Sequence, residues 1–509
     1  MWQIINYLKH TLKHKLLFWN TKNIKAKLVE YGPTFLIILI IVELIEHLGL
    51  PTLFYYLGNN VHDLFYLLIP APLLICLHFL TTPIIFFIYI YFSKKKKPFS
   101  EFFKNTLKLI TSISIAQFIP ILITPLLTQF FTPENFGAYG AYISICTIFG
   151  IVASGKFDTA IMLPKQKLDA INLLFLSLFM ASIFSVIFFS LLNIFKGSII
   201  EITKSKFLYQ HYYIIPISIF LISANISITT WLNRVKNYNT IAQQNILKSS
   251  SNAFTSLFLG VKNISSGLIL GHLTSIILIS IWNISYLIKK LNIGDLNMIL
   301  IRRNFKNYID FFKFSTLSSL FNSFSNLGMT TLIIIFFGPK TAGLYFLAEK
   351  LVAIPISFIT NSVSQVYFQK ASKLFYTNKV ELLNLTNKIQ KNIFFLIFPF
   401  LIVASIWGDD IFSIFGNEWK QAGIILKYFT AFILLKNLYS PISHIGDILS
   451  KQKLLLIFNV SLFLCQLITF YFFKDCNNIK PALLTASFLG AIHYLILNIY
   501  MKKELIKKL

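Results

Sequence analysis

Charged residues are scarce in this sequence, and acidic ones are the scarcest. Asp, Glu, Lys and Arg make up 13% of the 509 residues, and 19 acidic residues stand against 46 basic ones. Soluble domains carry about 25% charged residues. So low a share excludes a soluble protein, because apolar runs long enough to cross a bilayer recur along the chain. The sequence therefore predicts an all-α polytopic membrane protein.

Cysteines and catalytic motifs are also sparse. Spacings typical of metal ligation or of a disulfide framework are missing between the four cysteines, Cys76, Cys146, Cys465 and Cys476. The nine histidines are scattered, and the chain has no phosphate loop, no HExxH and no Gly-x-Ser-x-Gly. We therefore expect no enzymatic activity, no cofactor and no metal site.

The net charge is +27, and its distribution along the chain is typical of a membrane protein rather than of a nucleic-acid-binding surface. Lys outnumbers Arg, and the basic clusters stand at the ends of apolar runs. Cytoplasmic segments of membrane proteins carry an excess of Lys and Arg, so this pattern predicts that both termini lie in the cytoplasm. We expect the lipid bilayer as a partner and no nucleic acid.

One stretch of the sequence occurs twice. Phe131–Tyr139 and Phe337–Tyr345 share Phe, Pro, Gly and Tyr in the same register, 206 residues apart. An apolar span follows each copy, and the offset is far longer than the period of a solenoid repeat. The repeat predicts two membrane halves in parallel, with Gly137 and Gly343 at equivalent places.

About fourteen transmembrane helices are predicted. Residues 1–98 hold a basic segment and a two-helix hairpin, and end in the linker Lys94–Pro98. Residues 99–290 form an N-lobe with core helices 1–6, and residues 291–509 form the linker and a C-lobe with core helices 7–12. The core spans are expected at about 109–131, 137–155, 171–195, 212–232, 240–261, 267–288, 314–337, 343–368, 392–411, 422–446, 454–473 and 481–500. The fifth is the weakest, because its first half is polar.

Three charged residues inside predicted spans are candidates for a substrate site. A charge in a span costs about 2.5–3.5 kcal/mol on insertion scales, so it usually faces protein or water. Glu349 and Lys350 lie in the eighth core span and Lys436 lies in the tenth. One interpretation is a cationic lining for an anionic headgroup. The alternative is that each lysine is paired within the bundle or reaches toward the membrane surface.

Uncharged polar residues extend this candidate cavity. They lie in the first, seventh and eighth core spans, and the set is Gln117, Asn322, Asn326, Asn361 and Gln365. Hydrogen bonding between helices is the alternative explanation for these residues. Lys156, Asp158 and Arg234, at cytoplasmic ends of spans, are predicted to form a cytoplasmic gate, with ordinary solvation as the alternative for Lys156 and Asp158.

With these residues in view, the chain resembles the bacterial polysaccharide exporters. It is most similar to the O-antigen (Wzx-type) flippases of the multidrug/oligosaccharidyl-lipid/polysaccharide exporter superfamily. The resemblance covers about 100–500 and rests on five motifs in order: Phe131–Tyr139, Lys156–Pro164, Trp231–Lys236, Gly343–Tyr345 and Ile414–Gly423. The family pattern does not include residues 1–98.

The resemblance implies two six-helix lobes around a cavity lined by core spans one, two, seven and eight. It also implies transport of an undecaprenyl-pyrophosphate-linked oligosaccharide across a bacterial inner membrane by alternating access, alongside other polysaccharide-assembly proteins. A drug or cation antiporter of the same superfamily is an alternative, although it should favour acidic cavity residues. A membrane polymerase or ligase is the enzyme alternative, although the predicted outer loops are short. An exporter of teichoic acid or exopolysaccharide would use the same mechanism.

Overall fold

The computed structural model describes residues 116–117, 119–120, 123–197, 205–291, 293–449, 451–476 and 478–507. Contacts divide the chain into two compact units, Met1–Glu101 and Phe102–Leu509, and every described residue belongs to the second. The predicted hairpin within residues 1–98 therefore lies outside the described residues.

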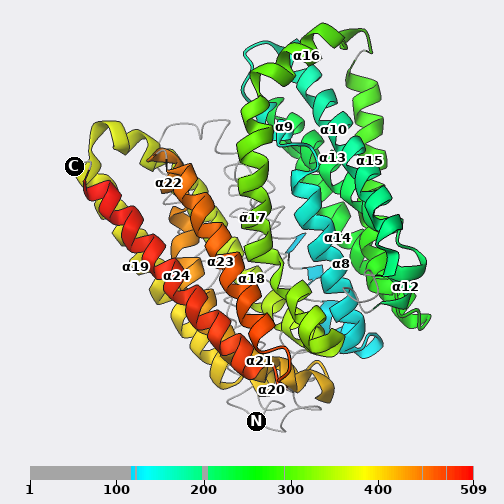
Figure 1. Cartoon of the computed structure of the whole chain (residues 1–509), viewed down its shortest axis with the longest axis vertical. Helices are drawn as coiled ribbons and strands as arrows, with labels where there is room; N and C mark the ends of the chain where they lie inside the picture. Colours follow the sequence, from blue (N-terminus) through cyan, green and yellow to red (C-terminus); the bar gives the residue numbers. More distant parts are fainter. Residues whose placement is uncertain are drawn as a thin grey trace, which may run out of the picture. The chain divides into compact units, whose positions relative to one another are not determined.

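The first half of the described chain folds into a helical bundle, coloured cyan to green in Figure 1. We call it the first bundle. Its helices are α8 (Pro133–Val152), α10 (Lys167–Ile194), α13 (Ile214–Arg234), α14 (Tyr238–Val261) and α15 (Gly267–Lys290). Two short helices, α9 (Phe157–Ala160) and α12 (Lys206–Gln210), lie in its connections. The core forms where α13 packs against α8, α10 and α15, and α14 packs against α15.

The second half forms another bundle, coloured from yellow-green to red. We call it the second bundle. Its long helices are α17 (Thr316–Leu327), α18 (Met329–Thr377), α19 (Lys379–Ile406), α21 (Lys420–Tyr439), α23 (Gln452–Phe472) and α24 (Lys480–Ile506). Shorter pieces are α20 (Gly408–Ser413), η5 (Asn417–Trp419), η6 (Ser440–Ile442) and α22 (Ile445–Ile448). Here α21 is central, because it packs against α18, α19, α20 and α24.

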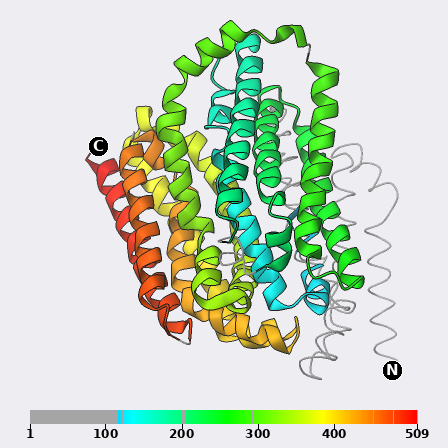
Figure 2. The same ribbon diagram turned by 45° about the vertical axis from the view of Figure 1, so that its right-hand side comes forward.

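A basic connection joins the bundles, and Figure 2 shows it passing from α15 through α16 to α17. It consists of η3 (Ile293–Asp295), α16 (Met298–Asn307) and the π-helical turn η4 (Phe311–Ser315). Arg303 makes an ion pair of 2.6 Å with Asp169 at the start of α10, and the Asn304 amide donates to the Asp169 carbonyl. These bonds hold α16 against the first bundle.

The prediction of an all-α membrane protein is confirmed. In the described part of the chain, nine helices are long and apolar enough to cross a membrane. The helix α14 is not among them, because its first half is polar, as expected for the weakest span. The total of about fourteen spans stays a prediction, since residues 1–115 and several short segments are not described.

The repeated turn starts a helix in both bundles. Thr132 caps α8 by accepting from the Asn135 backbone N–H, and Pro133 occupies the first turn, where its missing N–H costs nothing. At the matching place in α18, Gly338 has φ 85°, a conformation that favours glycine, and Pro339 follows. The residues before Gly338 therefore belong to one helix and those after it to the next, as the repeat predicts.

The two copies of the turn contact each other reciprocally. A Cβ on Gly137 would overlap the Pro339 carbonyl oxygen, and a Cβ on Gly343 would overlap that of Pro133. The same patch on both partners is the mark of a two-fold contact. This pseudo-two-fold contact, which we call the glycine crossing, confirms that Gly137 and Gly343 occupy equivalent places.

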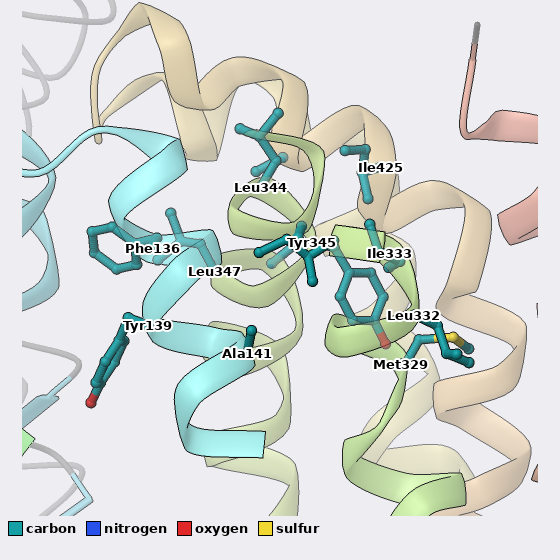
Figure 3. Close-up of a cluster of buried hydrophobic side chains, with 14 of the residues drawn as sticks. Phe136, Tyr139, Ala141, Met329, Leu332, Ile333, Leu344, Tyr345, Leu347 and Ile425 are labelled. Atoms are coloured by element: carbon teal, nitrogen blue, oxygen red, sulfur yellow. The ribbon is translucent and has the colours of Figure 1, made fainter. Parts of the chain in front are cut away.

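Buried side chains surround the glycine crossing. Figure 3 shows Phe136 and Tyr139 of α8 in one cluster with Tyr345 and Leu347 of α18, all of them buried. A second contact lies nearby, where the Trp419 ring meets the edge of Phe136 at 4.9 Å. Among the helices described, α8 makes most of the contact between the bundles, through α17 and α18.

The glycine crossing should not tolerate a methyl group. We expect Gly137→Ala and Gly343→Ala each to lower the free energy of unfolding by about 1–3 kcal/mol, because the overlapping atoms are backbone carbonyls that cannot move aside. Thermal unfolding of the purified protein in detergent measures this. The matched control is Gly197→Ala, since nothing lies within 4 Å of its new methyl group. Equal stability of Gly137→Ala and wild type would contradict the close approach.

Candidate functional site

Lys350 lies on the side of α18 that faces the first bundle. Its Nζ atom stands 5.9 Å from the ring centre of Tyr139 and 5.7 Å from that of Phe346. The two rings meet edge-on at 5.7 Å. A cation over aromatic faces is attracted by their quadrupoles, so Lys350 is held at the contact between the bundles.

No carboxylate pairs with Lys350 among the residues that the structure describes. Its side chain is half-buried. Lys350 therefore places a positive charge without a described carboxylate partner at the contact between the bundles.

A second lysine approaches the same place from the first bundle. Lys248 of α14 has an exposed side chain and stands one turn before Asn252, on which Gly271 of α15 packs. The next residue of α15 is His272, and its ring and the Lys350 Nζ atom both lie near the Tyr139 ring. The His272 ring is 8% exposed, stands edge-on to Tyr139 at 6.5 Å, and its Nδ1 has no hydrogen-bond partner among the described residues.

Gln117 lies in a segment that contacts α14. The Ser249 hydroxyl, next to Lys248 on α14, donates to the Ala116 carbonyl, which brings the neighbouring Gln117 against that helix. The Gln117 Oε1 atom is buried and accepts no hydrogen bond from any described residue. We call Lys350, Lys248, His272 and Tyr139 the interbundle site.

Glu349 and Lys436 lie together in a different place, inside the second bundle. Neighbouring residues on a helix point about 100° apart, so Glu349 turns away from Lys350. Tyr345 and Phe429 meet at 4.8 Å, and Glu349 follows one turn after the first and Lys436 two turns after the second. The two charges act on each other, and the Lys436 Nζ lies 5.7 Å from the Phe432 ring.

The asparagines that were predicted to extend the cavity lie on α17 and α18, more than two turns from Lys350 in sequence. Asn322 is exposed, and its side-chain oxygen accepts a hydrogen bond of 3.0 Å from Asn326. Asn326 in turn accepts from the Tyr494 hydroxyl at 3.4 Å, so it is tied to α24 of the second bundle. Asn361 is exposed, and the side chain of Gln365 lies outside the described set.

The charged turn after α8 contains two residues in the left-handed backbone conformation. Gly155 and Lys156 have φ 62° and 59°, and α9 follows them. Asp158 is 3% exposed and accepts from the Ser154 hydroxyl at 2.5 Å. Solvation, the alternative interpretation, is therefore wrong for Asp158.

Arg234 closes the same turn from the end of α13. Its guanidinium donates to the carbonyls of Ile161 and Pro164, at 2.9 and 2.5 Å. Asp158 thus binds the Ser154 side chain within this turn, and Arg234 of α13 binds two of the backbone carbonyls that follow it.

Sequence reasoning missed Lys248 and His272 as members of the site. A signal for Lys248 was present: Asn245, Lys248 and Asn252 recur at helical spacing and share one face of α14. For His272 no pattern in the sequence distinguishes a cavity residue from a core residue.

The interbundle site is suited to an anion. It combines two lysines, a histidine ring and a tyrosine, and no described carboxylate makes an ion pair with either lysine. Within the described residues, no group of His, Cys, Asp and Glu could hold a metal ion. The arrangement can bind and shield negative charge.

Solved structures of membrane transporters share this fold. The chain is similar to "Lipid II flippase MurJ, inward closed conformation", with a TM-score of 0.59 and 18% identity over 79% of this chain and 89% of that one. It is also similar to an inward-facing multidrug resistance MATE transporter of the MOP superfamily, with a TM-score of 0.57 and 14% identity over 79% of this chain and 94% of that one. At these identities the likeness shows the fold alone.

Sequence comparison gives the family. The chain is 33% identical over 144 residues to the teichuronic acid biosynthesis protein TuaB of Bacillus subtilis (strain 168), and this match spans 29% of that protein. A family model described as "Polysaccharide biosynthesis protein" matches residues 126–423, which is more than half of the chain and includes both copies of the turn. The chain therefore belongs to this polysaccharide biosynthesis protein family.

Proposed function

We propose that this protein is a flippase that carries an undecaprenyl-diphosphate-linked oligosaccharide from the cytoplasmic to the outer leaflet of a bacterial inner membrane. The membership of the family and the transporter fold support export of a polysaccharide precursor. Both termini lie in the cytoplasm in this proposal, and other membrane proteins of polysaccharide assembly act before and after it. The two lobes extend over 99–290 and 291–509.

The observation that carries the proposal is the unpaired cation at Lys350. A buried charge without a partner is costly in a membrane protein and is kept where a ligand or a pathway uses it. A diphosphate headgroup supplies the missing negative charge. A cationic drug would meet repulsion from Lys350 and from Lys248 at this place.

The chemistry of the substrate explains why a protein is needed. A glycan and a diphosphate that cross hydrocarbon lose their hydrogen bonds with water and the solvation of their charge. An internal polar site replaces both, while the polyprenyl tail stays in lipid. The lobes then rock about the bound headgroup, so that the site opens to one side of the membrane at a time.

The glycine crossing supports a closed outer end. In the proposed topology α8 and the second part of α18 both start at the outer surface, so the reciprocal glycine contact seals that side. Lys156, Asp158 and Arg234 lie at the opposite ends of their helices, where they form the cytoplasmic gate in this proposal. The substrate enters past them and meets Lys350 about 10 Å below the outer surface.

Replacing Lys350 should abolish transport without unfolding the protein. We expect Lys350→Ala to insert and fold normally, because the change removes an unpaired charge, and to lose transport at least about tenfold, because the headgroup loses its counter-charge. Lys350→Arg should keep more activity, since it keeps the charge. The measurement is transport of the lipid-linked glycan at matched levels of protein in the membrane. Wild-type transport by Lys350→Ala would remove the basis of the proposal.

The pair inside the second bundle should behave differently. We propose that Glu349 and Lys436 stabilise that bundle and do not touch the substrate. Glu349→Gln should lower the free energy of unfolding by roughly 1–3 kcal/mol, because it removes the carboxylate whose charge acts on Lys436. The double variant Glu349→Gln/Lys436→Met should recover most of the loss, and Asp410→Asn, at an exposed carboxylate, should have no effect.

Stability in detergent and transport are measured together for these variants. A double variant that is stable but inactive would show that the pair takes part in transport. A double variant that is no more stable than Glu349→Gln would show that the two charges do not depend on each other.

A further inference from the structure

We infer that Lys248 and His272 bind the same headgroup as Lys350, so that one diphosphate bridges the two bundles. This inference rests on the proposed function and assigns two more residues to its site. Lys248 and His272 come from α14 and α15 of the first bundle, and Lys350 comes from α18 of the second. The ligand chemistry is a diphosphate ester with two negative charges.

The packing of α14 against α15 places Lys248 at the site. Gly271 packs so closely on α14 that a Cβ there would touch the Asn252 carbonyl and the Ser256 hydroxyl. Asn252 also lies next to the Tyr139 side chain. Because residues four apart share one face of a helix, Lys248 stands one turn from Asn252 on the face that Tyr139 and His272 meet.

His272 supplies an unused polar atom beside the Tyr139 ring, which the Lys350 Nζ atom also approaches. Its ring is enclosed by Tyr139 at 6.5 Å and Tyr142 at 5.7 Å, both edge-on. The Tyr142 hydroxyl is already engaged with the Ser218 hydroxyl at 2.6 Å, so it does not serve His272. Buried polar atoms are nearly always hydrogen-bonded, and the unpartnered Nδ1 atom of this ring therefore points to a ligand.

The two lysine charges determine how many negative charges the ligand should carry. Lys248 and Lys350 contribute two positive charges, and neither has an ion pair with a carboxylate among the described residues. Two enclosed like charges repel each other, and a ligand with two negative charges removes both the repulsion and the loss of solvation. A phosphate diester carries one negative charge and leaves one lysine uncompensated.

A bridging ligand also couples binding to the arrangement of the lobes. Lys248 and Lys350 approach each other only when α14 and α18 are close, so the anion favours the state in which the bundles meet around it. A ligand shifts such an equilibrium by its difference in affinity for the two states. The loss of either lysine should therefore weaken binding and also weaken the stabilisation of the closed state by the ligand.

The test measures binding of defined lipids to the full-length protein in nanodiscs. The probes are undecaprenyl diphosphate and undecaprenyl monophosphate, each carrying one N-acetylhexosamine. We expect wild type to bind the diphosphate more tightly, and Lys248→Gln and His272→Gln to lose about tenfold or more in affinity for it. Lys248→Gln should also lose most of the preference over the monophosphate. Lys248→Arg should stay within about threefold of wild type.

The control is Lys262→Gln, which removes an exposed lysine just after α14 and should bind like wild type. Cardiolipin and a soluble nucleotide diphosphate sugar are added as competitors, and neither should displace the probe at equal concentration. Equal affinity of Lys248→Gln and wild type would overturn the inference while leaving the proposed function intact, provided that wild type transports the glycan lipid. Displacement by cardiolipin would assign the lysines to membrane phospholipid instead. If wild type binds neither probe, the proposed function itself fails.

Discussion

The close approach of Gly137 and Gly343 determines where every other functional group can lie. Backbone atoms of α8 and α18 meet there without side chains between them, and each glycine packs on the carbonyl of the proline that starts the opposite helix. Such a contact leaves no room for the helices to slide. Phe346 and Lys350, one and two turns farther along α18, therefore meet Tyr139 in a fixed register.

The repeat is symmetric in its backbone and asymmetric in its charge. Tyr139 and Tyr345 occupy equivalent positions and are 4% and 1% exposed. The positions equivalent to Glu349 and Lys350 in the first copy are Ile143 and Ser144, which carry no charge. The second copy thus supplies both charges, one for its own bundle and one for the contact with α8. The first bundle contributes its cation from another helix, at Lys248.

The sequence predicted the fold well because its signals are local. Each of these signals can be recognised within a short stretch: the apolar runs, the proline and glycine of the turn, and the basic ends of spans. The repeat of the turn at Phe131 and Phe337 predicted the two equivalent halves. The site was predicted in part. Lys350 was identified as a candidate, but Glu349 and Lys436 were grouped with it, since spacing along one helix does not tell which neighbouring helix each residue faces. Lys248 entered the prediction only as one of the polar residues that make the fifth core span the weakest.

One physical argument applies to all of these polar residues. In a membrane helix a polar residue has a cost, and the sequence shows that cost without showing what offsets it. For Glu349 and Lys436 the offset lies within the protein, because each is near the other. For Lys350 and Lys248 no such partner is found among the described residues. A protein that keeps two enclosed cations apart from its own carboxylates remains less stable than it could be. That loss of stability is useful where a passing anion offsets it for a time and then leaves, because a permanent internal partner would occupy the place of the substrate.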